Sequence, residues 1–158
     1  MAYLDVITLA DAKSYLRVDD TLTDDDAQIS RMIKSALSTI EKRTNVLVYA
    51  RSKNYLFQNY CVRVYDFPIN SVTLPLVADM TVEEKSLYTN YEAKKSTDKT
   101  LTLNVGYTDP LDVPYELVDC ALQYVKYLYY EAETDKANKG MLPLWLQDMI
   151  NQNKRYII

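Results

Sequence analysis

The chain has 158 residues, 48% of them hydrophobic and 25% charged, which is the balance of a single globular domain. It contains no histidine and only two glycines, so the commonest general base and metal ligand is missing, and no glycine-rich loop can hold a nucleotide phosphate. The net charge of −4 argues against tight, sequence-independent binding of nucleic acid, which requires a basic surface. These features disfavour an enzyme and favour a structural role.

Two further features concern the compartment of the protein. No stretch of about 18 apolar residues is present, so no membrane span is expected, and the first residues lack the pattern of a signal peptide. Cys61 and Cys120 lie far apart in apolar-patterned segments, and we expect two buried free thiols rather than a disulfide. Cytoplasmic assembly is therefore the expected default.

Two helices are predicted at the start of the chain. Thr8 and Asp11 form a capping box with Asp in place of the usual Glu, which predicts a short helix to about Arg17. A second helix is expected from Thr23 to about Thr44, where one stripe is apolar: Ile29, Ile33, Ala36, Leu37 and Ile40. The other side of that helix is expected to be polar: Arg31, Lys34, Ser38, Glu41 and Lys42.

Three consecutive carboxylates, Asp24, Asp25 and Asp26, open the second helix. Carboxylates in a first turn favour the positive end of the helix dipole, so helix capping is the favoured interpretation. Consecutive helical residues point in different directions, so these three cannot readily converge on a metal ion or act as a catalytic pair. An exposed acidic patch is the second interpretation.

Residues 46–107 change to a β pattern, in which β-branched and aromatic residues partly alternate with polar ones. We expect strands at Val46–Tyr49, Tyr55–Phe57, Cys61–Phe67, Ser71–Leu74 and Thr100–Tyr107. The polar stretch Asp79–Lys99 is expected to hold a hairpin with its tip around Lys94–Asp98. Lysines in this stretch are candidates for contact with DNA phosphates, but the acidic residues around them favour a solvated loop: Lys94, Lys95 and Lys99.

Helix is expected again after Asp112, with Pro114 in a first turn where its missing N–H costs nothing. One face of this third helix is apolar: Leu117, Ala121, Tyr124, Val125, Leu128 and Ala132. Tyr127 and Tyr130 are predicted to project from the opposite half, and two aromatic residues there favour a subunit interface over a solvated surface. A polar connector and a last short helix, opened by Pro143, follow.

The order of these elements resembles that of phage head–tail connector proteins. Residues 7–19, an acidic gap and residues 26–36 are similar to the family's opening, where a short helix precedes a longer amphipathic helix. The strand at Phe67–Val72, the segment Val105–Tyr107 and the helix from Val113 resemble later family elements in the same order. The charged insert between residues 79 and 99 and the extended C-terminal segment depart from the family pattern.

The pattern predicts an α+β fold, with a small helical bundle, a β-rich insertion between the second and third helices, and a C-terminal helical arm. The resemblance implies one connector domain over residues 1–158. Its parts are the N-terminal helices (1–45), the β-rich insertion (46–107), the third helix and connector (108–140) and the C-terminal arm (141–158). No catalytic residue, cofactor, metal ion or membrane partner is expected.

The resemblance also implies a role. Copies of the chain are expected to form a ring of twelve beneath the portal protein, in the neck of the virion. The ring would extend the channel for genomic DNA, which passes without sequence-specific binding, and would present a surface to a stopper or tail protein. A stopper or tail-completion protein is the alternative. A helix-turn-helix DNA-binding regulator is less favoured, because acidic residues open its second helix.

The C-terminal segment is the candidate docking element. Its helix is too short to be stable alone, since isolated helices below about 12–15 residues are marginal in water. We expect its apolar and aromatic residues to dock on a neighbouring subunit or on the portal, with one arginine as an orienting charge: Trp145, Met149, Arg155, Tyr156, Ile157 and Ile158. The alternative is that the segment folds back on its own core.

Overall fold

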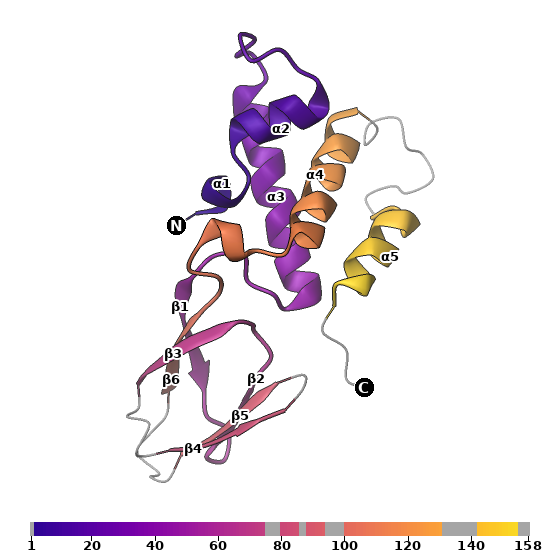
Figure 1. The fold of residues 1–158 in the computed structure, drawn as a ribbon. Helices are drawn as coiled ribbons and strands as arrows, with labels where there is room; N and C mark the ends of the chain where they lie inside the picture. Colours follow the sequence, from indigo (N-terminus) through magenta and orange to yellow (C-terminus); the bar gives the residue numbers. More distant parts are fainter. Residues whose placement is uncertain (1, 75–79, 86–87, 94–99, 131–141, 155–158) are drawn as a thin grey trace.

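The helices and strands form two parts of one elongated molecule (Figure 1). The computed structural model describes residues 2–74, 80–85, 88–93, 100–130 and 142–154. The helical part contains α1 (Tyr3–Val6), α2 (Leu9–Leu16), α3 (Asp26–Thr44), the 3₁₀ helix η2 (Pro110–Asp112), α4 (Tyr115–Tyr130) and α5 (Leu144–Gln152). The other part contains β1 (Arg51–Leu56), β2 (Cys61–Val64), β3 (Ile69–Leu74), β4 (Met80–Glu84), β5 (Thr89–Ala93) and β6 (Thr100–Val105). The predicted α+β class is confirmed.

The predicted capping box begins α2. The Thr8 side chain accepts a hydrogen bond from the Asp11 backbone N–H at 3.1 Å, and Asp11 accepts one from the Thr8 N–H at 3.1 Å. Both N-terminal helices end in a residue with left-handed backbone, Arg17 after α2 and Asn45 after α3. The helix α1, which the sequence analysis did not anticipate, precedes them.

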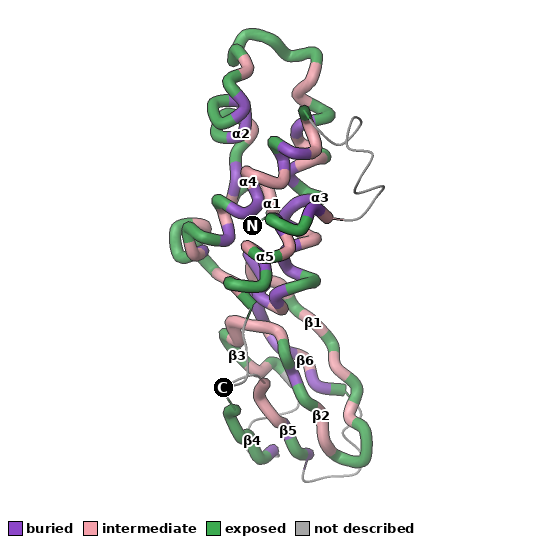
Figure 2. Tube along the Cα trace, turned by 90° about the vertical axis from the view of Figure 1, so that its right-hand side faces the viewer, coloured by how far each residue is buried: buried purple, intermediate pink, exposed green. Residues whose placement is uncertain are grey.

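The helical core lies where α3, α4 and α5 meet, with α1 and α2 closing the far side (Figures 1 and 2). The predicted apolar stripe of α3 is buried, and it faces the apolar stripe of α4. The residues that are completely buried in this core include Ile29, Ile33, Ala36, Leu37, Ile40, Ala121, Val125 and Leu146.

The strands form two antiparallel three-stranded sheets, one in the order β1-β6-β3 and one in the order β2-β5-β4. A second core lies between them: Leu47, Val64, Met80, Tyr91, Leu101, Leu103 and Val105. The hairpin predicted within residues 79–99 is present as β4 and β5, but the two strands are joined between Lys85, whose N–H donates to the Tyr88 carbonyl at 2.9 Å, and Tyr88, and not at Lys94–Asp98. Lys94, Lys95 and Lys99 lie outside the described residues.

The predicted strand at Val46–Tyr49 is wrong, because this segment joins no sheet and makes one isolated bridge, from Val46 to Phe67. Its alternating pattern has another cause. Val46 and Val48 point into the helical core, whereas Leu47 points into the β core. The segment is therefore the covalent junction between the two cores, and a period of two arises because each side faces a different core.

A buried carboxylate fixes this junction. The Glu41 side chain is 4% exposed and accepts hydrogen bonds from the Val48 backbone N–H at 2.9 Å and the Tyr3 hydroxyl at 2.6 Å. Arg51 at the start of β1 binds both carboxylate oxygens, at 3.2 and 2.8 Å, and lies over the Tyr49 ring. Glu41 thus ties α1, α3, the junction segment and β1 together, and its expected place on the polar side of α3 is wrong.

The described part of the C-terminal segment folds back on its own helical bundle. Leu146 and Ile150 of α5 are 0% and 1% exposed in the helical core. The Asn153 side chain donates hydrogen bonds to the Met149 carbonyl at 3.0 Å and to the Cys120 sulfur of α4 at 3.9 Å. An arm that extends away from the bundle over residues 144–153 is therefore not the arrangement in this structure, because the apolar face of α5 is buried here.

Candidate subunit interface

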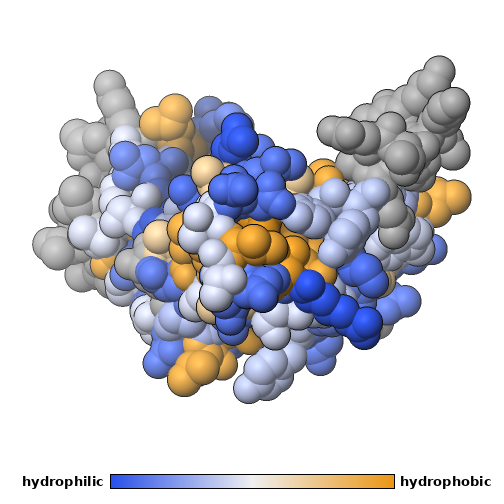
Figure 3. All heavy atoms as spheres, turned by 90° about the horizontal axis from the view of Figure 1, so that it is seen from above, coloured by the Kyte–Doolittle hydropathy of each residue, from blue (hydrophilic) through white to orange (hydrophobic). Residues whose placement is uncertain are grey.

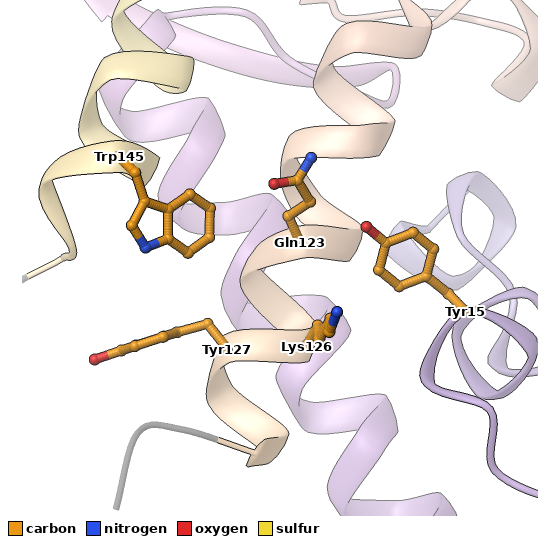
Figure 4. Close-up of a pocket in the computed structure, with 5 residues that line it drawn as sticks. All are labelled: Tyr15, Gln123, Lys126, Tyr127 and Trp145. Carbon is orange, nitrogen blue, oxygen red and sulfur yellow. The ribbon is translucent and has the colours of Figure 1, made fainter. Parts of the chain in front are cut away.

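An open groove of about 270 Å³ runs along the outer side of α4, between α2 and α5 (Figure 4). Tyr15 of α2 forms one wall and Trp145 of α5 the other, while α4 supplies the floor with Gln123, Lys126 and Tyr127. Tyr15 and Trp145 are 37% and 42% exposed. Aromatic walls around a polar floor are typical of surfaces that bury against another protein.

Negative charge lies beside the groove at the end nearer the start of α4, where Asp119 is located. Gln123 donates a hydrogen bond to the Asp119 carboxylate at 2.9 Å, four residues earlier on the helix. Partial burial raises the pKa of the Tyr15 hydroxyl, and the negative charge of Asp119 raises it further. The Tyr15 side chain is therefore a neutral hydrogen-bond donor at physiological pH.

Tyr127 was predicted to project from the outer half of the helix. The structure differs, because Tyr127 is only 7% exposed. Its ring lies 6.3 Å from that of Tyr124 and 6.4 Å from Trp145, which approaches it edge-on. The cause is α5, which covers the side of α4 that carries Tyr127. Tyr127 therefore forms part of the floor of the groove. Only a small part of its ring reaches the surface, so a contact between Tyr127 and another subunit stays a proposal for that part alone.

Tyr130 lies as expected on the outer side of α4 and is 52% exposed. Its hydroxyl donates to the Leu16 carbonyl at 2.7 Å, and the neighbouring Tyr129 hydroxyl donates to the Asp25 carboxylate at 2.6 Å. The two rings meet edge-on at 4.8 Å. The end of α4 is thus fastened to both N-terminal helices, and Tyr130 presents a ring whose position is already fixed.

Several large apolar side chains of the helical part are exposed. Besides Tyr15, Tyr130 and Trp145, they include Leu111, Tyr115 and Leu144, which are 75–82% exposed. Seen from the end that carries the turn between α2 and α3, the surface is mainly hydrophilic, with hydrophobic residues near its centre and at separate places towards its edges (Figure 3). Exposed apolar residues that cluster are candidates for a contact surface, whereas single ones need no explanation.

The predicted docking residues are only partly within the described chain. Trp145 stands at the groove wall, and Met149 is half-buried against the helical core. Arg155, Tyr156, Ile157 and Ile158 lie outside the described residues. The structure therefore describes two of the six predicted docking residues, Trp145 and Met149, and of these Trp145 is exposed.

The acidic run before α3 does not act as a simple cap. Asp25 is the N-cap residue but its side chain makes no capping hydrogen bond; it accepts the bond from Tyr129 instead. Asp26 pairs with Lys13 of α2 at 2.8 Å. Lys13 is only 3% exposed and also donates to the carbonyls of Asp20 and Leu22, at 3.1 and 2.6 Å. This lysine closes the loop between α2 and α3.

Two charged residues at the centre of these contacts, Lys13 and Glu41, escaped the sequence analysis. A signal for both was present. Lys13 lies four residues after Leu9 on the buried side of α2, and Glu41 lies four residues after Leu37 on the apolar stripe of α3. A charged residue in register with an apolar stripe is buried with a partner, because an unpaired buried charge is too costly.

Both cysteines are free, as expected, although Cys61 is half-buried rather than buried. Burial raises the pKa of the Cys120 thiol to about 11, with a further contribution from Asp119. Among the residues that the structure describes, no group of three His, Cys, Asp or Glu side chains is arranged to hold a metal ion. No helix in that part of the chain is long and apolar enough to cross a membrane.

Comparisons with known proteins show what the chain is similar to. Residues 6–69 match a family model described as Phage gp6-like head-tail connector protein. This segment runs from the end of α1 into β3, and the match confirms the resemblance that its motifs indicate. Comparison with curated proteins gave no match.

Three solved structures share the fold. In the neck of an empty GTA particle computed with C6 symmetry, the match has a TM-score of 0.75 and 17% identity, and covers 100% of this chain and 94% of that chain. In the neck of a native GTA particle computed with C12 symmetry, the TM-score is 0.71 at 15% identity, and the match covers 100% of this chain and 94% of that chain. In the virion of a native gene transfer agent (GTA) particle, the TM-score is 0.70 at 17% identity, and the match covers 97% of this chain and 91% of that chain. At these identities the likeness establishes the fold.

Proposed function

We propose that this chain is a structural head–tail connector subunit in the neck of a phage-like particle. Copies form a ring beneath the portal protein, extend the channel for genomic DNA, and present a docking surface to a stopper or tail protein. The observation that carries the proposal is the family match over residues 6–69 within a fold that matches two neck structures along its whole length. In this role the chain acts by geometry and performs no chemistry.

The site geometry supports this proposal in a second way. Connector subunits need exposed contact surfaces that are rigid before assembly, since ordering them on binding costs free energy. The side of α4 meets this requirement, because Tyr130 is held by its hydrogen bond to Leu16 and the groove walls stand on packed helices. Two neck matches computed with C6 and C12 symmetry favour a cyclic arrangement for the copies of this chain.

The test is assembly with and without a portal. We expect the chain alone to be monomeric or weakly associating, and to form closed rings when portal particles are added, as measured by native mass spectrometry. A stable dimer that ignores the portal would overturn the proposal. Binding to duplex DNA should be weak and without sequence preference at physiological salt, because the net charge is −4. Nanomolar, sequence-selective binding in a gel-shift assay would favour the regulator instead.

The docking role of the C-terminal residues is part of the same proposal. Asn153 contacts Met149 and Cys120, so a truncation should spare it and remove only residues 155–158. If Arg155 to Ile158 dock on a neighbour or on the portal, this truncated chain keeps its melting temperature but fails to join portal-bearing heads. A large loss of melting temperature with attachment intact would place these residues in the chain's own core.

The closest alternative is a stopper or tail-completion protein. Such a protein would occupy the same neck but would bind below the adaptor ring and not to the portal itself. Pull-down of this chain by isolated portal separates the two, because an adaptor binds directly and a stopper requires an adaptor ring first.

A further inference from the structure

All of the exposed charged residues of α3 are cationic. Its exposed charged residues are Arg31, Lys34, Lys42 and Arg43, and the two carboxylates of the helix are otherwise engaged. Glu41 is buried against Arg51, and Asp26 pairs with Lys13. At 100° per residue, three of these cations fall within about 80° of one another and span about 16 Å of the helix. We call Arg31, Lys34 and Lys42 the basic face.

The exposed side of α4 and α5 has the opposite charge. Glu116 and Asp119 are exposed on the first turns of α4, and Asp148 is exposed on α5, one turn from Trp145. We call Glu116, Asp119 and Asp148 the acidic face. It adjoins the groove, where Lys126 is the cation among the described lining residues, and the exposed ring of Tyr115. This face thus combines negative charge with aromatic anchors.

The two faces lie on opposite sides of the helical part. The apolar stripe of α3 and the apolar stripe of α4 are buried against each other in one core, so the exposed sides of the two helices point away from each other. One molecule cannot satisfy its basic face with its own acidic face. A second copy can, because its acidic face is complementary in sign.

We propose that the basic face of one copy docks on the acidic face of the next. The inference rests on the proposed ring and specifies its lateral contact. Different surfaces that meet on opposite sides of a subunit give a head-to-tail contact, which closes into a ring when the rotation permits. Charge complementarity sets the partner and the orientation of the copies, and the aromatic residues beside the acidic face supply the apolar contact area.

Duplex DNA is the rival occupant of the basic face. A DNA-binding surface would leave the acidic face without a partner and would place it on a molecule of net charge −4. A second copy accounts for both faces at once, which favours the protein contact.

The sharpest test exchanges the charges on one face at a time. Lys34→Glu with Lys42→Glu makes both faces acidic, and Glu116→Lys with Asp119→Lys makes both faces basic. Each variant alone should self-associate at least about tenfold more weakly than the unmodified chain at low salt. An equimolar mixture of the two should recover association, because each then offers the face that the other lacks. Sedimentation velocity measures all three cases.

Lys85→Glu with Glu84→Lys is the matched control. These residues are exposed on the β4–β5 hairpin, away from both faces, and this variant should associate like the unmodified chain. Zero-length carbodiimide coupling of mixed ¹⁴N and ¹⁵N chains adds an independent readout. It should join Lys34 or Lys42 of one chain to Glu116, Asp119 or Asp148 of another.

Several outcomes would overturn the inference. These are a mixture that stays dissociated, cross-links that avoid both faces, a control that weakens as much as the variants, or an unmodified chain that neither associates nor cross-links at about 1 mM. Loss of duplex binding in the Lys34→Glu, Lys42→Glu variant would assign the basic face to DNA. If rings form on the portal and both variants enter them normally, the inference fails while the proposed connector function stands. If no ring forms on the portal, the connector function fails, and the cross-links still decide the contact.

Discussion

Replacing Glu41 by Gln should weaken the connection between the helical and β parts. The substitution keeps the size of the side chain and removes its charge. A neutral amide can still accept the hydrogen bond from Val48 at Oε1, but its NH₂ group then replaces Oε2, which accepts from both the Tyr3 hydroxyl and Arg51 Nη2. At least one donor is left without an acceptor at a position that is almost fully buried.

The size of the effect follows from these contacts. A hydrogen bond to a charged group contributes about 1.5–3 kcal/mol, and removing one partner of a buried ion pair costs about 3–5 kcal/mol. Arg51 is 27% exposed and can recover some hydration, so the lower part of this range applies. We expect a loss of about 2–3 kcal/mol, which lowers the melting temperature of a domain of this size by about 5–10 °C. In the native chain Glu41 outweighs the effect of burial and raises the pKa of Arg51 above its usual range.

Urea denaturation followed by circular dichroism measures this loss, with Glu83→Gln as the control. Glu83 pairs with Lys85 on an exposed hairpin, and its neutralisation should change stability by less than about 0.5 kcal/mol. A double-mutant cycle with Arg51→Met should give a coupling of about 1–3 kcal/mol. If Glu41→Gln is as stable as the control, Glu41 does not hold the junction and the reasoning is wrong.

Three other perturbations test separate parts of the fold. Lys13→Met should cost about 2–4 kcal/mol in urea denaturation, because it leaves Asp26 and two loop carbonyls without their buried donor. Gly106→Ala should cost more than about 3 kcal/mol or prevent folding, since Gly106 has φ 107° and a Cβ would lie 2.1 Å from the Tyr49 carbonyl oxygen; an unchanged melting curve would contradict this. Cys120 should react with a thiol reagent at least about 100-fold more slowly than Cys61 at pH 8, and its rate should rise as pH approaches its pKa of about 11. Faster labelling of Cys120 when portal is added would show that α5 leaves α4 on docking.

The parts of the fold that the sequence predicted are those governed by local rules. The Thr8 capping box, the stripe from Ile29 to Ile40 and the helix after Pro114 depend on residues within a few turns of one another, and their positions agree with the structure within a few residues. The β4–β5 hairpin was also placed correctly in the chain, but its turn was not. Turn position depends on which strands pair, and β5 pairs with β2 as well as with β4.

The errors share one cause, which is contact between segments distant in sequence. Tyr127 lies on the outer half of α4 by helical geometry, and only the position of α5 buries it. Val46–Tyr49 alternates like a strand, but its two sides meet two different cores. Glu41 and Lys13 are residue types that usually lie at the surface, and their burial depends on partners outside their own helices, at the junction segment and β1 for Glu41 and in the loop and α3 for Lys13. Periodicity identifies a face of an element but not what covers it.

The position of Glu41 links the stability of the fold to the proposed ring. Both faces of the proposed lateral contact lie on helices, so the β part takes no share in it. Exposed apolar residues at the far end of the β part, Leu56 at 70% and Tyr60 at 50%, are therefore left for other contacts. If neighbouring subunits contact one another only through their helical parts, their β parts stay aligned around the ring only when each subunit is rigid between its helical part and its β part. The buried contacts of Glu41 and the alternation of Val46, Leu47 and Val48 between two cores supply that rigidity, because neither can loosen without exposing buried groups.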